Sequence, residues 1–446
     1  MNKLQVGFAR VNVTPMMGIE LMGYFFSRPA DGVLDEIEIN ALALACGEEK
    51  AVILCIDNEG LKQEVTTDFR QYISEQTGLP KSAIYIHSTH SHTAPIVKKD
   101  SSVEVEKEYY QVVRRKMLDV TKFALEDLKP AKMGWGIGQA PDIAFVRRYR
   151  MKDGSVQTNP GINNPDIVEP IGKADDQVYV LRFDRENDDS IVLVNFANHP
   201  DSVGGNKISA DWPGFTRRTI EKVLDNTKCL VINGAQGDIN HVNVHPIGGY
   251  MNDIRIDFDG PRGYKHSRYL GRVVAGGVLQ AFDKVKYVDV ETIKSISYPI
   301  HVASNMPKPE DMPEAYRIKE IHDAGRDDEL PYKGMMLTTV VAEALRMVEL
   351  EHGPEAYDME LSGLAIGNIA FVGIPGEPFA GIGYGIKEDA DWDMVLVTCI
   401  TNGKQGYFPM QDSYDEGGYE SRSSRFKAGV AEFIIEEGKK LLKELR

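Results

Sequence analysis

The sequence predicts an α/β protein in which helices cover a mixed β-sheet core, and two observations support this fold class. Short apolar segments typical of strands alternate with longer segments whose apolar residues recur at helical spacing. Several strand-like segments are apolar throughout, as expected for strands that lie under helices. The 446 residues, 42% of them hydrophobic, provide ample material for a core. We expect one domain over residues 1–446, because no repeat, low-complexity tract or clear linker interrupts the chain.

The predicted strands and helices follow from these apolar patterns. Strands are expected over residues 4–13, 37–45, 51–56, 83–87, 177–183 and 191–196. Helices are expected over residues 62–78, 104–128, 213–226, 266–284, 309–325, 338–351, 376–387 and 423–445. The last helix gathers its apolar residues on one face, which predicts packing against the sheet. Residues 140–176 and 240–265 are rich in Gly, Pro, Asp and Asn and have no steady period, so functional loops are expected there.

The charge balance limits the classes of binding partner that the sequence predicts. The chain has 51 Lys and Arg against 67 Asp and Glu, a formal net charge of -16, and no long basic run. This composition disfavours nucleic acid and anionic membranes and favours a neutral or weakly charged small-molecule substrate. No apolar run reaches membrane-spanning length, and residues 1–10 lack the apolar core of a signal peptide. The sequence as written is therefore expected to be cytoplasmic.

Three histidines crowd at the end of the strand expected over residues 83–87. His87, His90 and His92 lie within the segment Ile-His-Ser-Thr-His-Ser-His-Thr-Ala-Pro, residues 86–95. Alternate imidazoles on extended backbone can point the same way, which suits metal binding and proton transfer. A polar entry into a loop would give the same pattern, so this segment alone does not predict a metal.

Other reactive groups also follow apolar strands directly. His199 comes after the strand at residues 191–196, and Asp211 precedes the helix that begins near residue 213. Asp211 is placed to cap that helix or to orient a metal-binding imidazole. Glu377 follows the apolar run of residues 369–374 and could cap a helix or bind a cation.

A fourth segment combines a strand-like run with a turn of small residues. Asp238, Asn240 and His241 follow the apolar residues 231–232, and glycines at 234 and 237 lie between. Glycine permits close approach of a ligand to the backbone, although it also simply forms turns.

Two histidines and a glutamate at the carboxyl ends of strands are the usual ligand set of zinc hydrolases. Ligands collect at this edge of α/β sheets. His90 or His92, His199 and Glu377 could therefore bind one zinc ion, with a water molecule completing the site. Zinc lowers the pKa of such a water to about 7, which supplies hydroxide at neutral pH.

Taken together, these segments resemble the catalytic domain of the neutral/alkaline, non-lysosomal ceramidase family. The resemblance begins at residues 7–15, Gly-Phe-Ala-Arg-Val-Asn-Val-Thr-Pro, and continues with Met22-Gly23-Tyr24. Residues 89–95 are similar to the family's Thr-His-Thr-His-Ser-Gly-Pro, and residues 196–200 to Phe-Ala-x-His-Pro. Residues 208–211, 236–238 and 375–377 follow in the family's order as Ile-Ser-Ala-Asp, Gln-Gly-Asp and Pro-Gly-Glu.

The resemblance implies a site and an activity. One zinc ion per chain would be held by His90, His199, Glu377 and a tyrosine, with His92 close by in proton transfer. The family's Asn-x-Tyr-x-x-Tyr segment aligns best at Asn402, which makes Tyr407 the expected tyrosine ligand, with Tyr414 as the alternative. The family cleaves the amide bond of ceramide into a fatty acid and sphingosine.

Three departures from the family pattern point away from ceramide. First, Asn240 stands where the family has an essential serine; second, Leu34 and Asn40 stand where it has a histidine and an arginine. Third, the final helix closes at Arg446, so no C-terminal immunoglobulin-like domain is expected. We therefore predict a zinc-dependent hydrolase that uses metal-activated water to cleave the C–N amide bond of a small or soluble N-acyl substrate.

The functional groups of the remaining candidate residues predict their roles. His92 or Asp211 would move protons, and Asn240 would donate a hydrogen bond to the developing oxyanion. Polar groups of the substrate would be bound by Arg147, Asn195, Asp238 and His241. Hydrolysis of an ester or a glycoside is the alternative reaction, and a non-catalytic metal-binding relative is the third interpretation.

Overall fold

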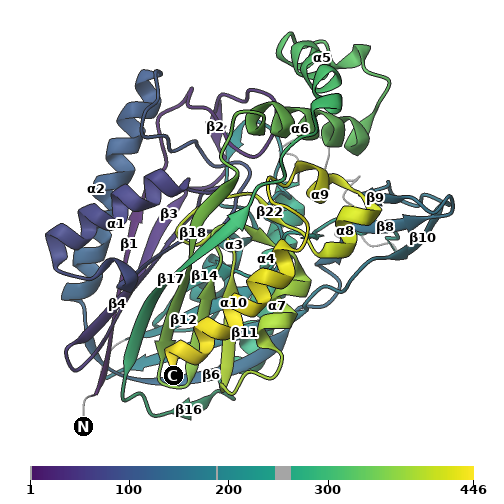
Figure 1. The fold of residues 1–446 in the computed structure, drawn as a ribbon. Coiled ribbons are helices and arrows are strands. Elements are labelled where there is room, and N and C mark those ends of the chain that lie inside the picture. The colour runs from purple at the N-terminus through teal and green to yellow at the C-terminus, as the bar shows by residue number, and fades with distance from the viewer. Residues whose placement is uncertain (1–2, 187–188, 247–262) are drawn as a thin grey trace.

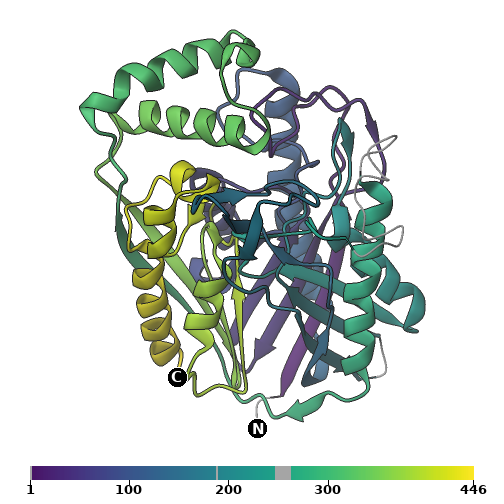
Figure 2. The same ribbon diagram turned by 90° about the vertical axis from the view of Figure 1, so that its right-hand side faces the viewer.

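Two β-sheets packed face to face form the centre of the fold, and helices cover both outer surfaces (Figures 1 and 2). The structure is a computed structural model and describes residues 3–186, 189–246 and 263–446. The observed α/β architecture with a mixed sheet confirms the predicted fold class, and it adds a second sheet that the sequence did not reveal. Within the described ranges, no helix is both long and apolar enough to cross a bilayer.

The larger sheet has the strand order β14-β12-β11-β6-β1-β3-β4-β5, with β16 also paired to β6. Most neighbouring strands are antiparallel, whereas β4 pairs with β5 and β12 with β14 in parallel. The bounds are β1 Leu4–Asn12, β3 Glu38–Cys46, β4 Glu49–Ile56, β5 Ile84–Ser88, β6 Lys129–Gln139, β11 Gln177–Arg185, β12 Ser190–Phe196, β14 Thr227–Asn233 and β16 Lys286–Val288.

The smaller sheet has the order β17-β18-β19-β21. Its strands are β17 Ile293–Ala303, β18 Ala356–Ile366, β19 Ile369–Gly373 and β21 Met394–Thr398. Alternation along the strands builds the layers, because successive side chains point to opposite faces of a sheet. In β3, Leu42 and Leu44 pack between the two sheets, whereas Ala41 and Ala43 face the outer helices.

Helices cover the outer face of each sheet. The larger sheet carries α1 Gln63–Thr77 and α2 Glu104–Glu126 over one part, and α3 Asp211–Val223 and α4 Tyr264–Phe282 over the other. The smaller sheet carries α7 Ala380–Lys387 and α10 Val430–Leu445. Helices α5 Met312–Asp323 and α6 Gly334–Leu350 form a pair that projects from one end of the molecule (Figure 2), with α8 Gln411–Glu416 and α9 Tyr419–Ser423 below it.

Short elements connect the layers at the end that carries the predicted site. The strands are β2 Gly32–Val33, β7 Phe145–Val146, β8 Arg148–Met151, β9 Val156–Thr158, β10 Ile167–Pro170, β13 Lys207–Ile208, β15 Ile239–Asn240, β20 Glu377–Pro378 and β22 Tyr407–Phe408. Short 3-10 helices occupy Lys81–Ala83, Pro309–Asp311 and Asp327–Glu329.

The predicted elements agree with the structure to within a few residues, with the following exceptions. The helix expected over residues 423–445 begins only at Val430, and Phe426 before it forms an isolated β-bridge with Ser304. The helix expected over residues 376–387 begins only at Ala380, because Glu377 and Pro378 pair in parallel with Tyr407 and Phe408. The loop expected over 140–176 contains the three-stranded sheet β10-β8-β9. Part of the loop expected over 240–265 lies outside the described residues.

His87 joins the edges of the larger sheet to the smaller one. Its Nε2 accepts a hydrogen bond from the backbone N–H of Asn233 at 2.8 Å, and its Nδ1 lies 2.8 Å from the carbonyl oxygen of Cys399. His87 lies in β5, Asn233 ends β14 and Cys399 follows β21, so one imidazole joins the ends of three strands. Burial lowers the pKa of His87 to about 3, so the ring is neutral and Nδ1 is the nitrogen that donates.

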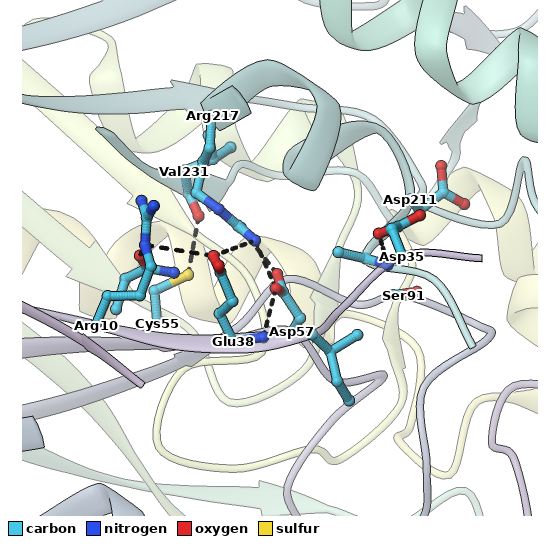
Figure 3. Close-up of polar contacts among 12 residues, drawn as sticks. Arg10, Asp35, Glu38, Cys55, Asp57, Ser91, Asp211, Arg217 and Val231 are labelled. Atoms are coloured by element: carbon cyan, nitrogen blue, oxygen red, sulfur yellow. Dashed lines mark hydrogen bonds and ion pairs between the residues drawn. The ribbon is translucent and has the colours of Figure 1, made fainter. Parts of the chain in front are cut away.

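Buried ion pairs attach α3 to the end of β4 (Figure 3). The guanidinium of Arg217 donates to both carboxylate oxygens of Asp57, at 2.9 and 2.5 Å. Glu38 lies 3.4 Å from Arg217 and 3.3 Å from Arg10. Because Arg217 and Asp57 are almost fully buried, each charge needs the other to offset the cost of its removal from water.

We expect Arg217→Met to lower the free energy of unfolding by about 3–5 kcal/mol, because Asp57 would remain buried without its main partner. Urea denaturation of the purified variant measures the change. The control is Arg218→Met, at the next position of α3, whose partly exposed pair with Asp35 should contribute less than about 1 kcal/mol. Equal losses in the two variants would contradict the assignment.

Candidate metal centre

Three imidazoles and one carboxylate converge at one end of the two sheets. His90 and His92 follow β5, His199 follows β12, and Glu377 begins β20. The Nε2 atom of His90 lies 3.1 Å from Nε2 of His199 and 3.3 Å from Nε2 of His92. One carboxylate oxygen of Glu377, Oε2, lies 3.2 Å from Nε2 of His90 and 3.4 Å from Nε2 of His199. Four electron-pair donors thus point at one small volume.

Backbone carbonyls orient two of the imidazoles. Nδ1 of His90 lies 2.5 Å from the carbonyl oxygen of Glu59, and Nδ1 of His199 lies 3.2 Å from that of Gln236. A carbonyl oxygen only accepts, so each Nδ1 carries a proton, and Nε2 is the nitrogen that offers a lone pair when the ring is neutral. Metal-binding histidines show this arrangement, because the Nδ1 contact fixes both the tautomer and the ring orientation.

The chain around His90 adopts an unusual backbone conformation. His90 has a φ of 76°, in the left-handed region that non-glycine residues rarely occupy. The N–H of His90 donates to the carbonyl of Asn58 at 2.8 Å, and the N–H of Thr89 donates to that of Ile56 at 2.9 Å. The turn after β4 therefore holds the segment after β5, and these contacts keep His90 in its left-handed conformation.

The donor set fits a metal cation. Oε2 of Glu377 is buried and makes no hydrogen bond within the described residues. Burial alone would raise the pKa of Glu377, but the adjacent His90, whose own pKa is raised by Glu377, holds it well below its usual range. Burial together with the Arg147 charge keeps the pKa of His199 well below its usual value, so this imidazole is neutral. A three-histidine cluster with an unsatisfied carboxylate oxygen can bind a metal ion.

A cavity of about 510 Å³ opens beside the donors. Tyr407 and Tyr419 line it with their ring centroids 5.6 Å apart, and Lys404 lines it while paired with the carboxylate of Glu59. The remaining lining is formed by residues 20–27, His90, His92 and Glu377. The donors are therefore accessible to a small molecule from one side.

The sequence-predicted ligands meet in this place. His90, His199 and Glu377 lie together, as expected. Tyr407 pairs with Glu377 along the backbone and lines the same cavity, while its bond to a metal stays a prediction. The proton-transfer role of His92 also stays a prediction, and its position adds a third possible nitrogen ligand.

Arg147 lies behind Tyr407. The Arg147 guanidinium is 5.3 Å from the centroid of the Tyr407 ring, pairs with the buried carboxylate of Glu420 at 2.6 Å and donates to the carbonyl of Gly237 at 2.7 Å. Burial and the nearby Glu377 charge raise the pKa of Tyr407 well above its usual value. Arg147 therefore supports the tyrosine wall of the cavity.

Asp211 lies behind His199. Its φ is 52°, and its carboxylate accepts hydrogen bonds from the N–H groups of Val203 and Trp212, at 3.1 and 2.6 Å, and from the hydroxyls of Ser202 and Ser267. Asp35 holds the preceding turn, because its carboxylate accepts a hydrogen bond from the hydroxyl of Ser209 at 2.8 Å. These contacts fix the chain three residues beyond His199.

Four further predicted residues make other contacts. Asn240 donates to the side-chain oxygen of Asn159 at 3.1 Å, and Asn195 donates to the carbonyls of Ile232 and Val397. His241 lies 3.1 Å from Asp201, and Asp238 accepts from the N–H of Ala380 at 2.7 Å. In the described part of the chain, the residues around the cavity do not include these four, Arg147 or Asp211. Their catalytic and substrate-binding roles stay predictions.

Sequence reasoning missed several residues around the cavity. Glu59 and Lys404 form an ion pair beside His90, and Phe25 and Phe26 line the entrance with Tyr24. A signal was present for Glu59, which follows the apolar strand β4 as His199 follows β12. The run of aromatic residues at 24–26 was a second signal.

The raised pKa of Asp238 can be tested by measuring how the stability of the protein depends on pH. Burial raises its pKa to about 6, against about 3.9 in an unfolded chain. The folded-state pKa is the higher one, so the protein loses stability as the pH rises from about 4 to about 6. Asp238→Asn keeps an oxygen for the N–H of Ala380 and removes the charge.

We expect the unfolding free energy of Asp238→Asn, relative to the unsubstituted protein, to increase by about 1–3 kcal/mol between pH 4 and pH 7. Urea denaturation of both proteins at the two pH values measures this difference. A constant offset between the two proteins would show that the carboxyl does not titrate in this range.

Comparison with known proteins supports the architecture. No family model and no curated protein matches the sequence. Among solved structures, a neutral ceramidase from Pseudomonas aeruginosa matches with a TM-score of 0.74 at 14% identity, over 100% of this chain and 75% of the ceramidase chain. A ceramidase complexed with C2 matches with a TM-score of 0.73, also at 14% identity, over 100% of this chain and 76% of that one. The predicted resemblance is confirmed for the fold: the chain has a neutral ceramidase-like fold.

Proposed function

We propose that the protein is a zinc-dependent hydrolase that cleaves the amide bond of a small or soluble N-acyl substrate. The observation that carries the proposal is the convergence of His90, His92, His199 and Glu377 beside a cavity. The fold shared with two ceramidases supports amide hydrolysis as the reaction class. It does so by analogy, since one fold can host several chemistries.

The ligand set suits zinc among the common metals. Imidazole nitrogens with one carboxylate oxygen are typical of catalytic zinc sites. His90, His199 and Glu377 would hold the ion, and Tyr407 would complete the protein ligands. When bound, zinc polarises a carbonyl and lowers the pKa of a coordinated water to about 7.

His92 is placed to move a proton. Burial and the neighbouring His90 lower its pKa to about 4, so the imidazole is neutral at neutral pH and one ring nitrogen offers a lone pair. Its Nδ1 is buried without a hydrogen-bond partner in the described chain, so a substrate or water could use this nitrogen. We assign His92 to proton transfer toward the leaving amine.

Asn240 distinguishes this chain from a hydrolase with a serine nucleophile at the same position. Its amide group cannot attack a carbonyl carbon, and it is hydrogen bonded to Asn159. The proposal therefore needs no covalent intermediate at residue 240. Hydrolysis of an ester would use the same residues, and a substrate panel separates the two reactions.

Metal analysis tests the centre directly. We expect close to one zinc ion per chain in the purified protein, and a loss of most of it in His199→Ala and in Glu377→Gln, because each substitution removes a ligand. The control is His301→Ala, at an exposed histidine paired with Asp358 on β17. A zinc content that the first two variants leave unchanged would contradict the assignment.

Kinetics test the role of His92. We expect His92→Ala to keep its zinc and to lose about 10²–10⁴-fold in kcat on amide substrates, because general acid–base catalysis contributes about this much. The panel contains matched amides, esters and aryl glycosides, and zinc is measured in the same samples. Loss of zinc would make His92 a ligand, and unchanged kcat would exclude it from proton transfer.

A further inference from the structure

Three consecutive aromatic side chains stand at the entrance of the cavity. Tyr24, Phe25 and Phe26 line it together with His90 and His92. They are 42%, 40% and 66% exposed, although aromatic rings of this size usually dominate protein cores. A gathering of exposed apolar side chains beside a cavity marks a binding surface.

Buried contacts hold this segment in place. Arg28 is 2% exposed, donates to the carbonyl of His92 at 2.6 Å and to that of Gly205 at 3.0 Å, and also donates to the carbonyl of Met22. Its guanidinium lies 4.0 Å from the centroid of the Tyr24 ring, a cation–π contact. The backbone of the segment and the Tyr24 ring are therefore held in place before any ligand binds, which lowers the entropic cost of binding.

Gly23 brings the segment into contact with His92 of the candidate metal centre. Gly23 has a φ of +100°, and a Cβ atom there would lie 2.6 Å from the ring of His92. The backbone therefore passes directly over His92, and the following aromatic rings start at that histidine. The ring of Tyr24 meets that of His92 edge-on at 5.9 Å.

The ring geometry suits a flat partner. Tyr24 and Phe26 are stacked, with centroids 5.6 Å apart and planes 24° from parallel. Phe25 meets Tyr419 edge-on at 6.5 Å, which closes the opposite side. Offset stacking and edge-to-face contacts are the arrangements that aromatic rings prefer with one another. The cavity volume of about 510 Å³ falls in the range of small-molecule sites.

We propose that Tyr24, Phe25 and Phe26 form an aromatic platform that binds a planar ring of the substrate and so determines specificity. This inference rests on the proposed amide hydrolysis and deepens it by naming the substrate class, ring-bearing amides. The ring stacks on the exposed Phe26 while the scissile carbonyl reaches the donors next to His92.

Four amides of similar polarity at the scissile bond test the platform. They are N-phenylacetyl-butylamine, N-acetyl-benzylamine, N-acetyl-butylamine and N-dodecanoyl-butylamine, with products measured by mass spectrometry. We expect one ring-bearing amide to have a kcat/KM at least about tenfold above that of N-acetyl-butylamine. Which one is preferred shows whether the ring lies on the acyl or the amine side.

Substitution of Phe26 tests whether this side chain causes the preference for ring-bearing amides. In Phe26→Ala the kcat/KM for the preferred ring-bearing amide should fall about fivefold or more relative to that for N-acetyl-butylamine, and Phe26→Trp should restore it. The control is Phe123→Ala, at a ring on α2 that is 53% exposed. A preference for the dodecanoyl amide, or a preference for rings that Phe26→Ala leaves unchanged, would overturn the proposal.

A binding measurement separates failure of the platform from failure of the proposed hydrolysis. Calorimetry compares phenylacetate with butyrate, two acids that differ in the ring. If no amide is cleaved, the proposed function fails, and tighter binding of phenylacetate that is lost in Phe26→Ala still supports the platform. Equal binding of the two acids would overturn it.

Discussion

The buried imidazole of His87 is the contact on which the arrangement of the site depends. It accepts from the backbone of Asn233 and donates to that of Cys399, so it joins the end of β14 and the chain after β21 to β5. Each of these strands leads into a segment of the candidate site: His90 and His92 after β5, Gln236 after β14, and Tyr407 beyond β21. Protonation of His87 would place a second donor against a backbone N–H, and burial prevents this by lowering its pKa.

A second set of contacts orients the donors within that frame. The carbonyls of Glu59 and Gln236 receive the Nδ1 protons of His90 and His199, which leaves both Nε2 atoms facing Glu377. The carbonyl of Glu59 is itself located by the turn after β4, where Asp57 is held by Arg217. The chain of contacts thus runs from α3 through the turn to the candidate metal centre.

Much of this fold could be predicted from the sequence, because apolar periodicity reports directly on strands and helices. The six predicted strands lie where the pattern placed them, and His90, His199 and Glu377, the proposed ligands, lie close together. The second sheet was harder, because β17 and the start of β18 carry polar residues between apolar ones. The short pair of β20 and β22 was also missed, because two residues give no periodicity.

The side-chain roles could not be read from the sequence for a different reason. Asp238, Asn240 and Asn195 carry functional groups typical of active sites, yet in the structure these groups satisfy backbone or side-chain partners. Only tertiary contacts decide whether a polar group faces a ligand or the protein. The aromatic residues at 24–26 show the converse, since a run typical of a core lies at the cavity entrance.

The separation between the aromatic platform and the metal donors has a consequence for how such a protein could change over time. Residues 20–28 form one short segment, and its contacts with the histidines are made by Gly23, the Tyr24 ring and Arg28. The rings at positions 24–26 could therefore be exchanged by single substitutions while the donors keep their backbone supports. A lineage with this layout can acquire new substrates through one short surface segment and leave its reaction chemistry intact.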